Sequence, residues 1–95
     1  MSSYECVFIL RADLGEEASE EAIQRVLGQI ADFGGTVENV DRWGKRRLAY
    51  EIDDQREGVY TVLRLHAQPG QTAELERNLK LAGDVLRYLV VKVET

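Results

Sequence analysis

Four cationic side chains gather in one short segment of this chain. Residues 42–47 read Arg-Trp-Gly-Lys-Arg-Arg and include no acid. Arginine offers planar paired donors and lysine a point charge, and both contact phosphate groups. Two interpretations stay open. The cations pair with acids just before and after the segment, or they contact the phosphate backbone of a nucleic acid, with the bend at Gly44 letting them project together.

The charge of the whole chain, taken alone, argues against a nucleic-acid partner. Its 95 residues hold 12 Lys and Arg against 17 Asp and Glu, a formal net charge of −5. Binding to a polyphosphate depends on neutralisation by cations. The charges are unevenly placed, however, because residues 13–41 carry eight acids and a single base, Arg25. The average therefore conceals a basic segment that follows an acidic one.

Residues that could support catalysis or bind a metal are scarce. The single histidine, His66, ends a predicted strand, and no Ser-Asp pair or Cys stands at a recognisable spacing from it. We expect a structural histidine there, and we expect Cys6 in the core. Adjacent acids such as Glu16 and Glu17 point in different directions on a helix, so they do not converge on a metal. Enzymatic activity, a cofactor and a metal site are therefore not expected.

Length and composition predict one folded domain outside the membrane. A content of 44% apolar and 31% charged residues is typical of globular proteins, and 95 residues suit one domain. The longest apolar run, residues 6–10, has five residues, whereas a membrane helix needs about 20. One cysteine excludes an internal disulfide and favours a reducing compartment, and the chain does not open with the pattern of an export signal.

Hydrophobic periodicity predicts four strands and two helices in the order βαββαβ. Strand character covers residues 4–10, 36–52 with an interruption near Gly44, 59–67 and 86–93; helical character covers 16–33 and a shorter segment around 75–82; and 53–58 is a turn by composition. Two split β-α-β units interleave most simply as a four-stranded antiparallel sheet with both helices on one face. The sequence therefore predicts an α+β fold of the ferredoxin-like type.

Such a sheet has one covered face and one open face, and side chains alternate between the two. Counting by twos sorts the residues of each strand into two sets without saying which set is inside, and we take Cys6, Phe8, Leu63, Leu65 and Val90 as one face. If that face meets the helices, the open face carries Val7, Ile9, Tyr60, Val62, Leu89 and Val91. An uncovered apolar patch of this kind usually marks an interface. Because Tyr60 is the one aromatic residue in this set, readout of single-stranded RNA by base stacking is a weak interpretation.

The basic segment resembles a known protein family. Residues 44–52, Gly-Lys-Arg-Arg-Leu-Ala-Tyr-Glu-Ile, are similar to the signature of bacterial small-subunit ribosomal protein six. Tyr4-Glu5, Gly34-Gly35, residues 57–60 and residues 86–92 also fall in that family's order and spacing, so the resemblance covers almost the whole chain. It implies one ferredoxin-like domain over residues 1–95, a structural role in the bacterial-type small ribosomal subunit of the cytoplasm, and neither catalysis nor a cofactor.

The resemblance also implies partners and contact residues. The implied partners are the central domain of small-subunit (16S-type) ribosomal RNA and small-subunit ribosomal protein eighteen. The family's basic positions correspond to Arg46, Arg47, Arg87 and Lys92, and further candidates for RNA contact are Trp43 and Lys45. The candidates for contact with the protein partner are Tyr4, Tyr60, Val62, Leu89 and Val91.

Two departures from the family pattern limit these expectations. Asp53 stands where members often have a basic or small residue, so RNA contact is not extended past Ile52. The chain also stops at Thr95, whereas many members continue with a tail. A rival interpretation remains, a small oligomeric regulatory or ligand-binding ferredoxin-like domain that self-associates through its apolar face. A stable homodimer in solution would favour this rival, and a monomer would favour the ribosomal interpretation.

Overall fold

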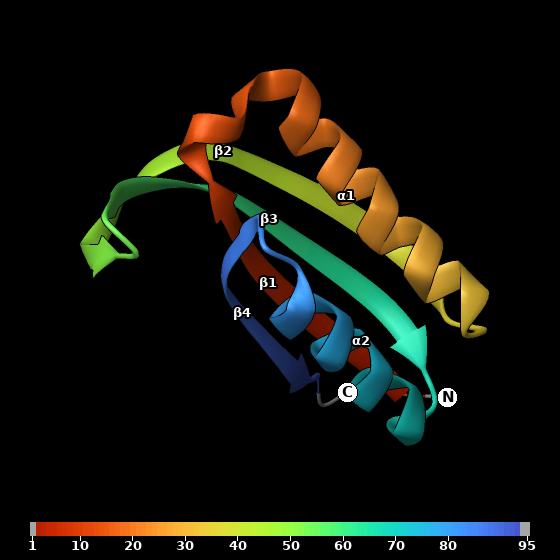
Figure 1. Ribbon diagram of the computed structural model, residues 1–95. Coiled ribbons are helices and arrows are strands. Elements are labelled where there is room, and N and C mark those ends of the chain that lie inside the picture. The colour runs from red at the N-terminus through yellow and green to blue at the C-terminus, as the bar shows by residue number, and fades with distance from the viewer. Residues whose placement is uncertain (1, 94–95) are drawn as a thin grey trace.

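A four-stranded antiparallel sheet carries two α-helices on one of its faces (Figure 1). This computed structural model describes residues 2–93. The strands are β1 (Ser2–Arg11), β2 (Thr36–Ile52), β3 (Gln55–Ala67) and β4 (Val85–Lys92); the helices are α1 (Gly15–Asp32) and α2 (Pro69–Leu81); and a 3₁₀ turn, Ala12–Leu14, joins β1 to α1. The strand order is β2-β3-β1-β4, with β1 and β3 in the centre. The predicted ferredoxin-like α+β fold is therefore confirmed.

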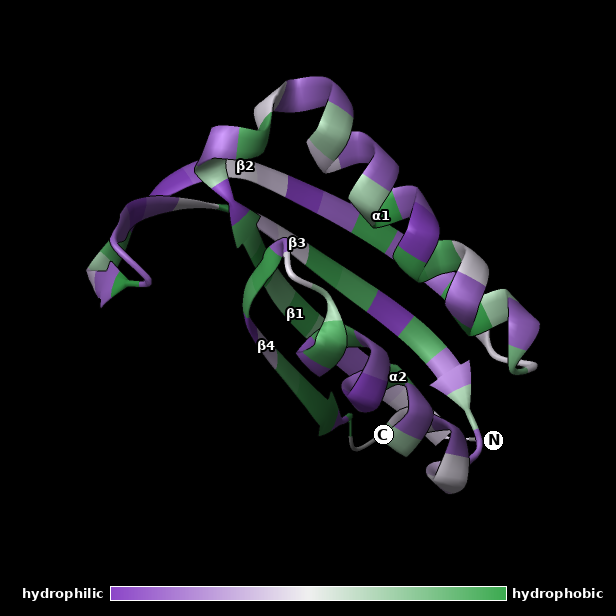
Figure 2. Cartoon of the chain, in the orientation of Figure 1, coloured by the Kyte–Doolittle hydropathy of each residue, from purple (hydrophilic) through white to green (hydrophobic). Residues whose placement is uncertain are grey.

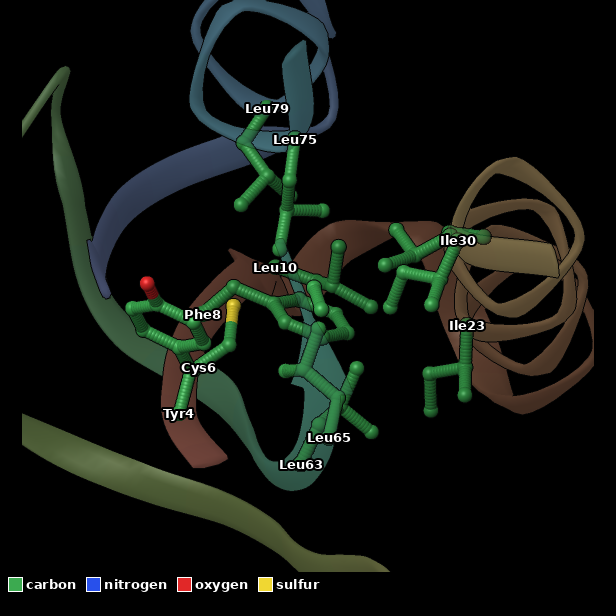
Figure 3. Packing of buried hydrophobic residues seen from close by; sticks show 13 residues of the cluster. Tyr4, Cys6, Phe8, Leu10, Ile23, Ile30, Leu63, Leu65, Leu75 and Leu79 are labelled. Carbon is green, nitrogen blue, oxygen red and sulfur yellow. The ribbon is translucent and has the colours of Figure 1, made fainter. Parts of the chain in front are cut away.

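Buried and partly exposed side chains alternate along the two central strands, and the buried set marks the face of the sheet that the helices cover. In β1 every second residue is buried, and Cys6 and Phe8 are fully enclosed together with Leu63 and Leu65 of β3. The helices close this layer with Ile23, Ile30, Leu75 and Leu79 (Figure 3). Figure 2 shows hydrophobic residues (green) along much of β1, β3 and β4 and a mixture of hydrophilic and hydrophobic residues along both helices. The expected division of residues between the two faces is thus confirmed.

The β2–β3 hairpin is longer than the sequence indicated. A turn was expected over residues 53–58, but only Asp53 and Asp54 form it, and Ile52 already pairs with Gln55. The hairpin extends past the other strands (Figure 1), where both of its faces meet solvent. Polar residues are tolerated in such an exposed strand, and an ion pair of 3.2 Å between Arg56 and Glu51 joins the two arms. Polar composition therefore misplaced the start of β3.

A β-bulge interrupts β2 near Gly44, as predicted. The register with β3 shifts between Arg42, opposite Thr61, and Gly44, opposite Tyr60, so Trp43 is an extra residue. Gly44 has φ +80°, a conformation that favours glycine.

The helix ends are fixed by residues near the predicted stops. Gly34, with φ +92°, follows α1, and Gly35 N–H donates to Ile30 O at 2.9 Å. Pro69 begins α2 instead of preceding it, because proline suits the first helical turn. Gln71 Nε2 donates to Phe33 O at 2.5 Å and so ties the start of α2 to the end of α1. Neither helix within residues 2–93 combines the length and the apolar character that a membrane crossing requires.

Candidate RNA and partner interface

Ion pairs within the fold determine which cations remain available to an external anion. Five arginines have a carboxylate partner: Arg11, Arg25, Arg42, Arg56 and Arg64. Within residues 2–93, no carboxylate lies within ion-pairing distance of the predicted RNA-contact cations, which are Lys45, Arg46, Arg47, Arg87 and Lys92. The interpretation of internal pairing therefore holds for Arg42 alone within the basic segment, and phosphate contact by the other three cations stays a prediction.

Arg42 is the member of the basic segment that pairs internally. Its Nη2 and Nε donate to the two carboxylate oxygens of Glu20 on α1, at 2.6 and 3.0 Å. These hydrogen bonds lower the pKa of Glu20 below its usual range and raise the pKa of Arg42. The partner lies 22 residues earlier in the chain, not beside the segment as expected. The ion pair between Arg42 and Glu20 links α1 to the edge strand β2 and leaves Arg42 less available to an external anion.

The bulge brings Trp43, Tyr60 and Arg46 together on the open face of the sheet. The Trp43 and Tyr60 rings are stacked, with centroids 6.2 Å apart and planes inclined by 11°. The guanidinium carbon of Arg46 lies 5.6 Å from the centroid of the Trp43 ring, within cation–π range. Trp43 Nε1 donates to Asp41 at 2.9 Å, and 46% of the Trp43 residue surface stays exposed. A cation thus lies against a flat aromatic surface that is open to solvent.

Tyr50 and Arg87 form a second aromatic–cation pair. The Arg87 guanidinium lies 5.7 Å from the centroid of the Tyr50 ring and donates to its hydroxyl. Arg87 is opposite Ile9, which is opposite Tyr60 in turn, so this pair lies in the same row of the sheet as the Trp43 stack. Sequence reasoning missed Tyr50. Its even spacing from Arg46, beyond the bulge at Gly44, was the signal that could have placed it on the open face.

An apolar patch adjoins these two pairs on the open face. Val7 lies between Val62 and Leu89 in the register, and Val91 is two residues beyond Leu89. Leu89 is 60% exposed and Val91 is 43% exposed, although both are large apolar side chains on an edge strand. We call Val7, Val62, Leu89 and Val91 the apolar patch, and we call Trp43, Arg46, Tyr50, Tyr60 and Arg87 the aromatic–cation cluster.

The structure does not bring every predicted contact residue to this face. Tyr4 is 7% exposed and packs in the core on the helix side. Lys92 pairs in register with Tyr4 and therefore belongs to the helix-side row of β4. Lys45 lines a groove between the sheet and α1, and exposed Arg47 is opposite Glu57 in the hairpin. Of the predicted RNA residues, only Trp43, Arg46 and Arg87 share the open face.

His66 has partners that the sequence did not reveal. Its Nδ1 lies 3.3 Å from Ser3 Oγ on β1, and its Nε2 contacts the carboxylate of Glu38 on β2. The register places Ser3 and Thr36 on either side of His66, so this polar group spans three strands. A hydroxyl, an imidazole and a carboxylate are the groups of a nucleophilic triad. The Ser3–His66 hydrogen bond, at 3.3 Å, is slightly longer than the range of about 2.6–3.2 Å that is usual between a nucleophile and its base.

Other reactive groups are absent or inert in the part of the chain described. Cys6 is fully enclosed, and burial raises the pKa of its thiol to about 12. A thiolate is the reactive form of cysteine, so Cys6 is unreactive near neutral pH. Residues 2–93 hold no cluster of three His, Cys, Asp or Glu side chains able to bind a metal ion.

Comparison with known proteins yields one consistent family. The family model described as Ribosomal protein S6 matches residues 3–92. The small ribosomal subunit protein bS6 of Moorella thermoacetica is 44% identical over 94 residues, which cover 99% of this chain and 96% of that protein. The corresponding protein of Clostridium novyi is 46% identical over 94 residues, which cover 99% of both.

Solved structures agree with this match. The crystal structure of 30S ribosomal protein S6 from Thermotoga maritima has a TM-score of 0.93 at 30% identity and covers 97% of this chain and 87% of that one. The C-terminal domain of the MgtC protein from Mycobacterium tuberculosis has a TM-score of 0.65 at 14% identity, a similarity of fold alone.

Proposed function

Since this chain belongs to the ribosomal protein S6 family of the small ribosomal subunit, we propose that it binds small-subunit (16S-type) ribosomal RNA, in the central domain, together with small-subunit ribosomal protein eighteen. The observation that carries the proposal is the adjacency of two unlike surfaces on the open face, the aromatic–cation cluster and the apolar patch. Family membership favours this function over a self-associating regulatory domain.

The aromatic–cation cluster is the proposed RNA surface. Arg46 and Arg87 are exposed and have no carboxylate partner within residues 2–93, so neither must break an ion pair to reach a phosphate. Each lies against an aromatic ring, Trp43 or Tyr50, that limits the rotamers open to the arginine. The exposed rings also offer faces for unpaired bases, and the guanidinium groups offer bidentate donors to phosphate.

The apolar patch is the proposed surface for the protein partner. Leu89 and Val91 leave much of their apolar area in water, and covering such area with a partner is favourable at about 25 cal/mol per Å². The net charge of −5 suits a partner that is itself basic. Because the patch adjoins Arg87, a protein on β4 would add its own cations next to those of this chain.

Separate surfaces for RNA and for a protein partner would allow a chain of negative net charge to take part in RNA binding. Each phosphate contact releases counterions and strengthens binding at low salt, but two or three contacts give only modest affinity. Joining a second RNA-binding chain makes its contacts act together with these through a high effective concentration. The proposed role is structural and catalyses no reaction, and the buried Cys6 supplies no reactive thiolate near neutral pH.

Matched arginine variants test the RNA surface. The double variant Arg46→Ala and Arg87→Ala is compared with Arg11→Ala and Arg56→Ala, which removes two charges already neutralised by Asp13 and Glu51. Affinity for a central-domain RNA fragment is measured in the presence of protein eighteen between about 50 and 200 mM salt. We expect the slope of log affinity against log salt to become less negative, by about 1.4–1.8, in the first variant only, because two phosphate contacts are lost. Equal slopes in both variants would contradict the proposal.

A second variant separates the protein partner from the RNA. Leu89→Lys places a charge in the apolar patch, at its most exposed side chain, and should prevent a one-to-one complex with protein eighteen in sedimentation, without RNA present. The control is Leu81→Lys on α2, because Leu81 is also a strongly exposed leucine but lies on the helix layer. If both variants bind protein eighteen normally, the apolar patch is not its docking surface.

A further inference from the structure

An open groove lies at the outer edge of the sheet, between the last turn of α2 and the first half of β4. Its volume is about 330 Å³, within the range of ligand sites in proteins. Its lining is Leu79, Lys80, Val85, Leu86, Arg87 and Tyr88. Because β4 is an edge strand, no further strand within residues 2–93 closes this side of the sheet. We call this hollow the edge groove.

The lining of the edge groove carries two positive charges and no negative charge. Lys80 and Arg87 are both exposed, and neither has a carboxylate within ion-pairing distance among residues 2–93. Asp84, which directly precedes β4, is held by Arg25 on α1, whose Nη2 donates to the two carboxylate oxygens at 2.8 and 2.7 Å. Glu76, one helical turn before Lys80, forms no ion pair in the described part of the chain. The edge groove therefore favours an anionic group.

Arg87 joins the edge groove to the proposed RNA surface. The same side chain lines a smaller hollow of about 120 Å³ on the open face, together with Tyr50 and Tyr60, and its guanidinium lies against the Tyr50 ring. Lys80 therefore extends the row of cations from the aromatic–cation cluster past the edge strand, toward the helix layer. Two cations that line one groove can contact the same phosphate or successive phosphates of a strand.

The position of Lys80 also meets a local need of the helix. Lys80 is the basic residue in the last turn of α2, where a cation stabilises the partial negative charge of the helix C-terminus. That helix end on its own would repel a phosphate, and Lys80 offsets the repulsion. A role at the helix end and a role in RNA contact differ in one measurable respect, because only RNA contact makes the salt dependence of RNA binding sensitive to Lys80.

Resting on the proposed function, we infer that Lys80 is a further RNA-contact residue, and that the sugar–phosphate backbone passes from the open face around the β4 edge into the edge groove. There a phosphate group accepts hydrogen bonds from Lys80 Nζ and from Arg87, and the sugar packs on the half-buried Leu86. Leu89 and Val91 of the apolar patch lie on the second half of β4, so RNA in the edge groove leaves them free for the protein partner.

Matched variants of α2 test the inference. Lys80→Ala removes the cation from the edge groove, and Lys80→Arg keeps its charge. The control is Arg77→Ala, which removes another exposed α2 cation that has no carboxylate partner within residues 2–93 and does not line the edge groove. Affinity for a central-domain RNA fragment is measured with protein eighteen present, between about 50 and 200 mM salt. Urea midpoints and binding of protein eighteen without RNA are measured for the same variants.

We expect the slope of log affinity against log salt to become less negative by about 0.7–0.9 in Lys80→Ala, the effect of one lost phosphate contact. Lys80→Arg and Arg77→Ala should keep the slope of the unchanged chain. Equal slopes in Lys80→Ala and Arg77→Ala would overturn the inference alone if the Arg46→Ala and Arg87→Ala double variant still changes the slope, and would overturn the proposed RNA surface as well if it does not.

Two further results would assign Lys80 to another role and overturn the inference. A lowered urea midpoint for Lys80→Ala with an unchanged salt slope would mean that Lys80 serves only the end of α2. Loss of protein eighteen binding in Lys80→Ala without RNA present, to the extent expected for Leu89→Lys, would mean that the edge groove belongs to the protein partner.

Discussion

Gly58 of β3 lies directly against the side chain of Ile9 on β1. A Cβ atom on Gly58 would come well inside 3.0 Å of Ile9 Cγ2 and would also contact Leu48 at 3.4 Å. Overpacking of this kind costs about 1–3 kcal/mol. Gly58→Ala should therefore lower the free energy of unfolding by that amount in urea titrations. Gly83→Ala, where the added atom meets nothing within 4 Å, is the control, and equal midpoints for both variants would contradict the packing argument.

The hairpin turn carries residues that fit it poorly. Asp53 and Asp54 have φ of 48° and 64°, the left-handed conformation of a type I′ turn, in which Asn-Gly is preferred. Asp53→Asn with Asp54→Gly should stabilise the protein by up to about 1 kcal/mol, since glycine adopts the left-handed conformation without the Cβ clash that aspartate retains in part. Thermal unfolding measures the gain. Asp53→Ala with Asp54→Ala should have the opposite effect, because alanine resists positive φ.

The ion pair between Glu20 and Arg42 should make stability depend on pH. Hydrogen bonds from Arg42 hold the pKa of Glu20 below its ordinary value of 4.5. A lowered pKa in the folded state stabilises the fold above pH 4.5, and this contribution is lost as the pH falls through the folded-state value. Glu20→Gln should therefore lose less stability than the wild type when urea midpoints are compared at about pH 7 and pH 3. A control is Glu17→Gln, at an exposed acid that forms no ion pair with the described residues; if it flattens the pH dependence equally, the pair is not the cause.

Cys6 should resist alkylation in the folded protein. Its side chain is fully enclosed, and burial raises the pKa of the thiol from 9.0 to about 12. Iodoacetamide at about pH 8 should leave the native chain unmodified and should label it within minutes in concentrated urea, as mass spectrometry would show. Fast labelling without denaturant would mean that β1 is accessible, and it would contradict the packing of the core.

The local hydrophobic pattern predicted the order of helices and strands, because apolar residues recur with one period in a strand and another in a helix. Counting alone groups Phe8 with Cys6 and Leu63 with Leu65, since the strand period is 2. The contacts of the candidate site could not be assigned in this way. The pairing of Tyr50 with Arg87 depends on the register of distant strands and on the bulge in β2, and the pairing of Arg42 depends on where α1 packs. Both contacts depend on how distant elements pack against one another, which the local sequence pattern does not determine.

The bulge at Gly44 reverses the alternation of side chains between the two faces of the sheet along β2. In an uninterrupted strand, Arg42 and Arg46 would share one face; the extra residue puts Arg42 beside α1 and Arg46 beside Trp43. Arg46, opposite Gly58, keeps this shifted phase, and the register with β3 shifts again between Arg47 and Ile52. Deleting one residue at the bulge would turn Arg46 to the helix side of the sheet, so this backbone irregularity decides on which face the Arg46 guanidinium lies.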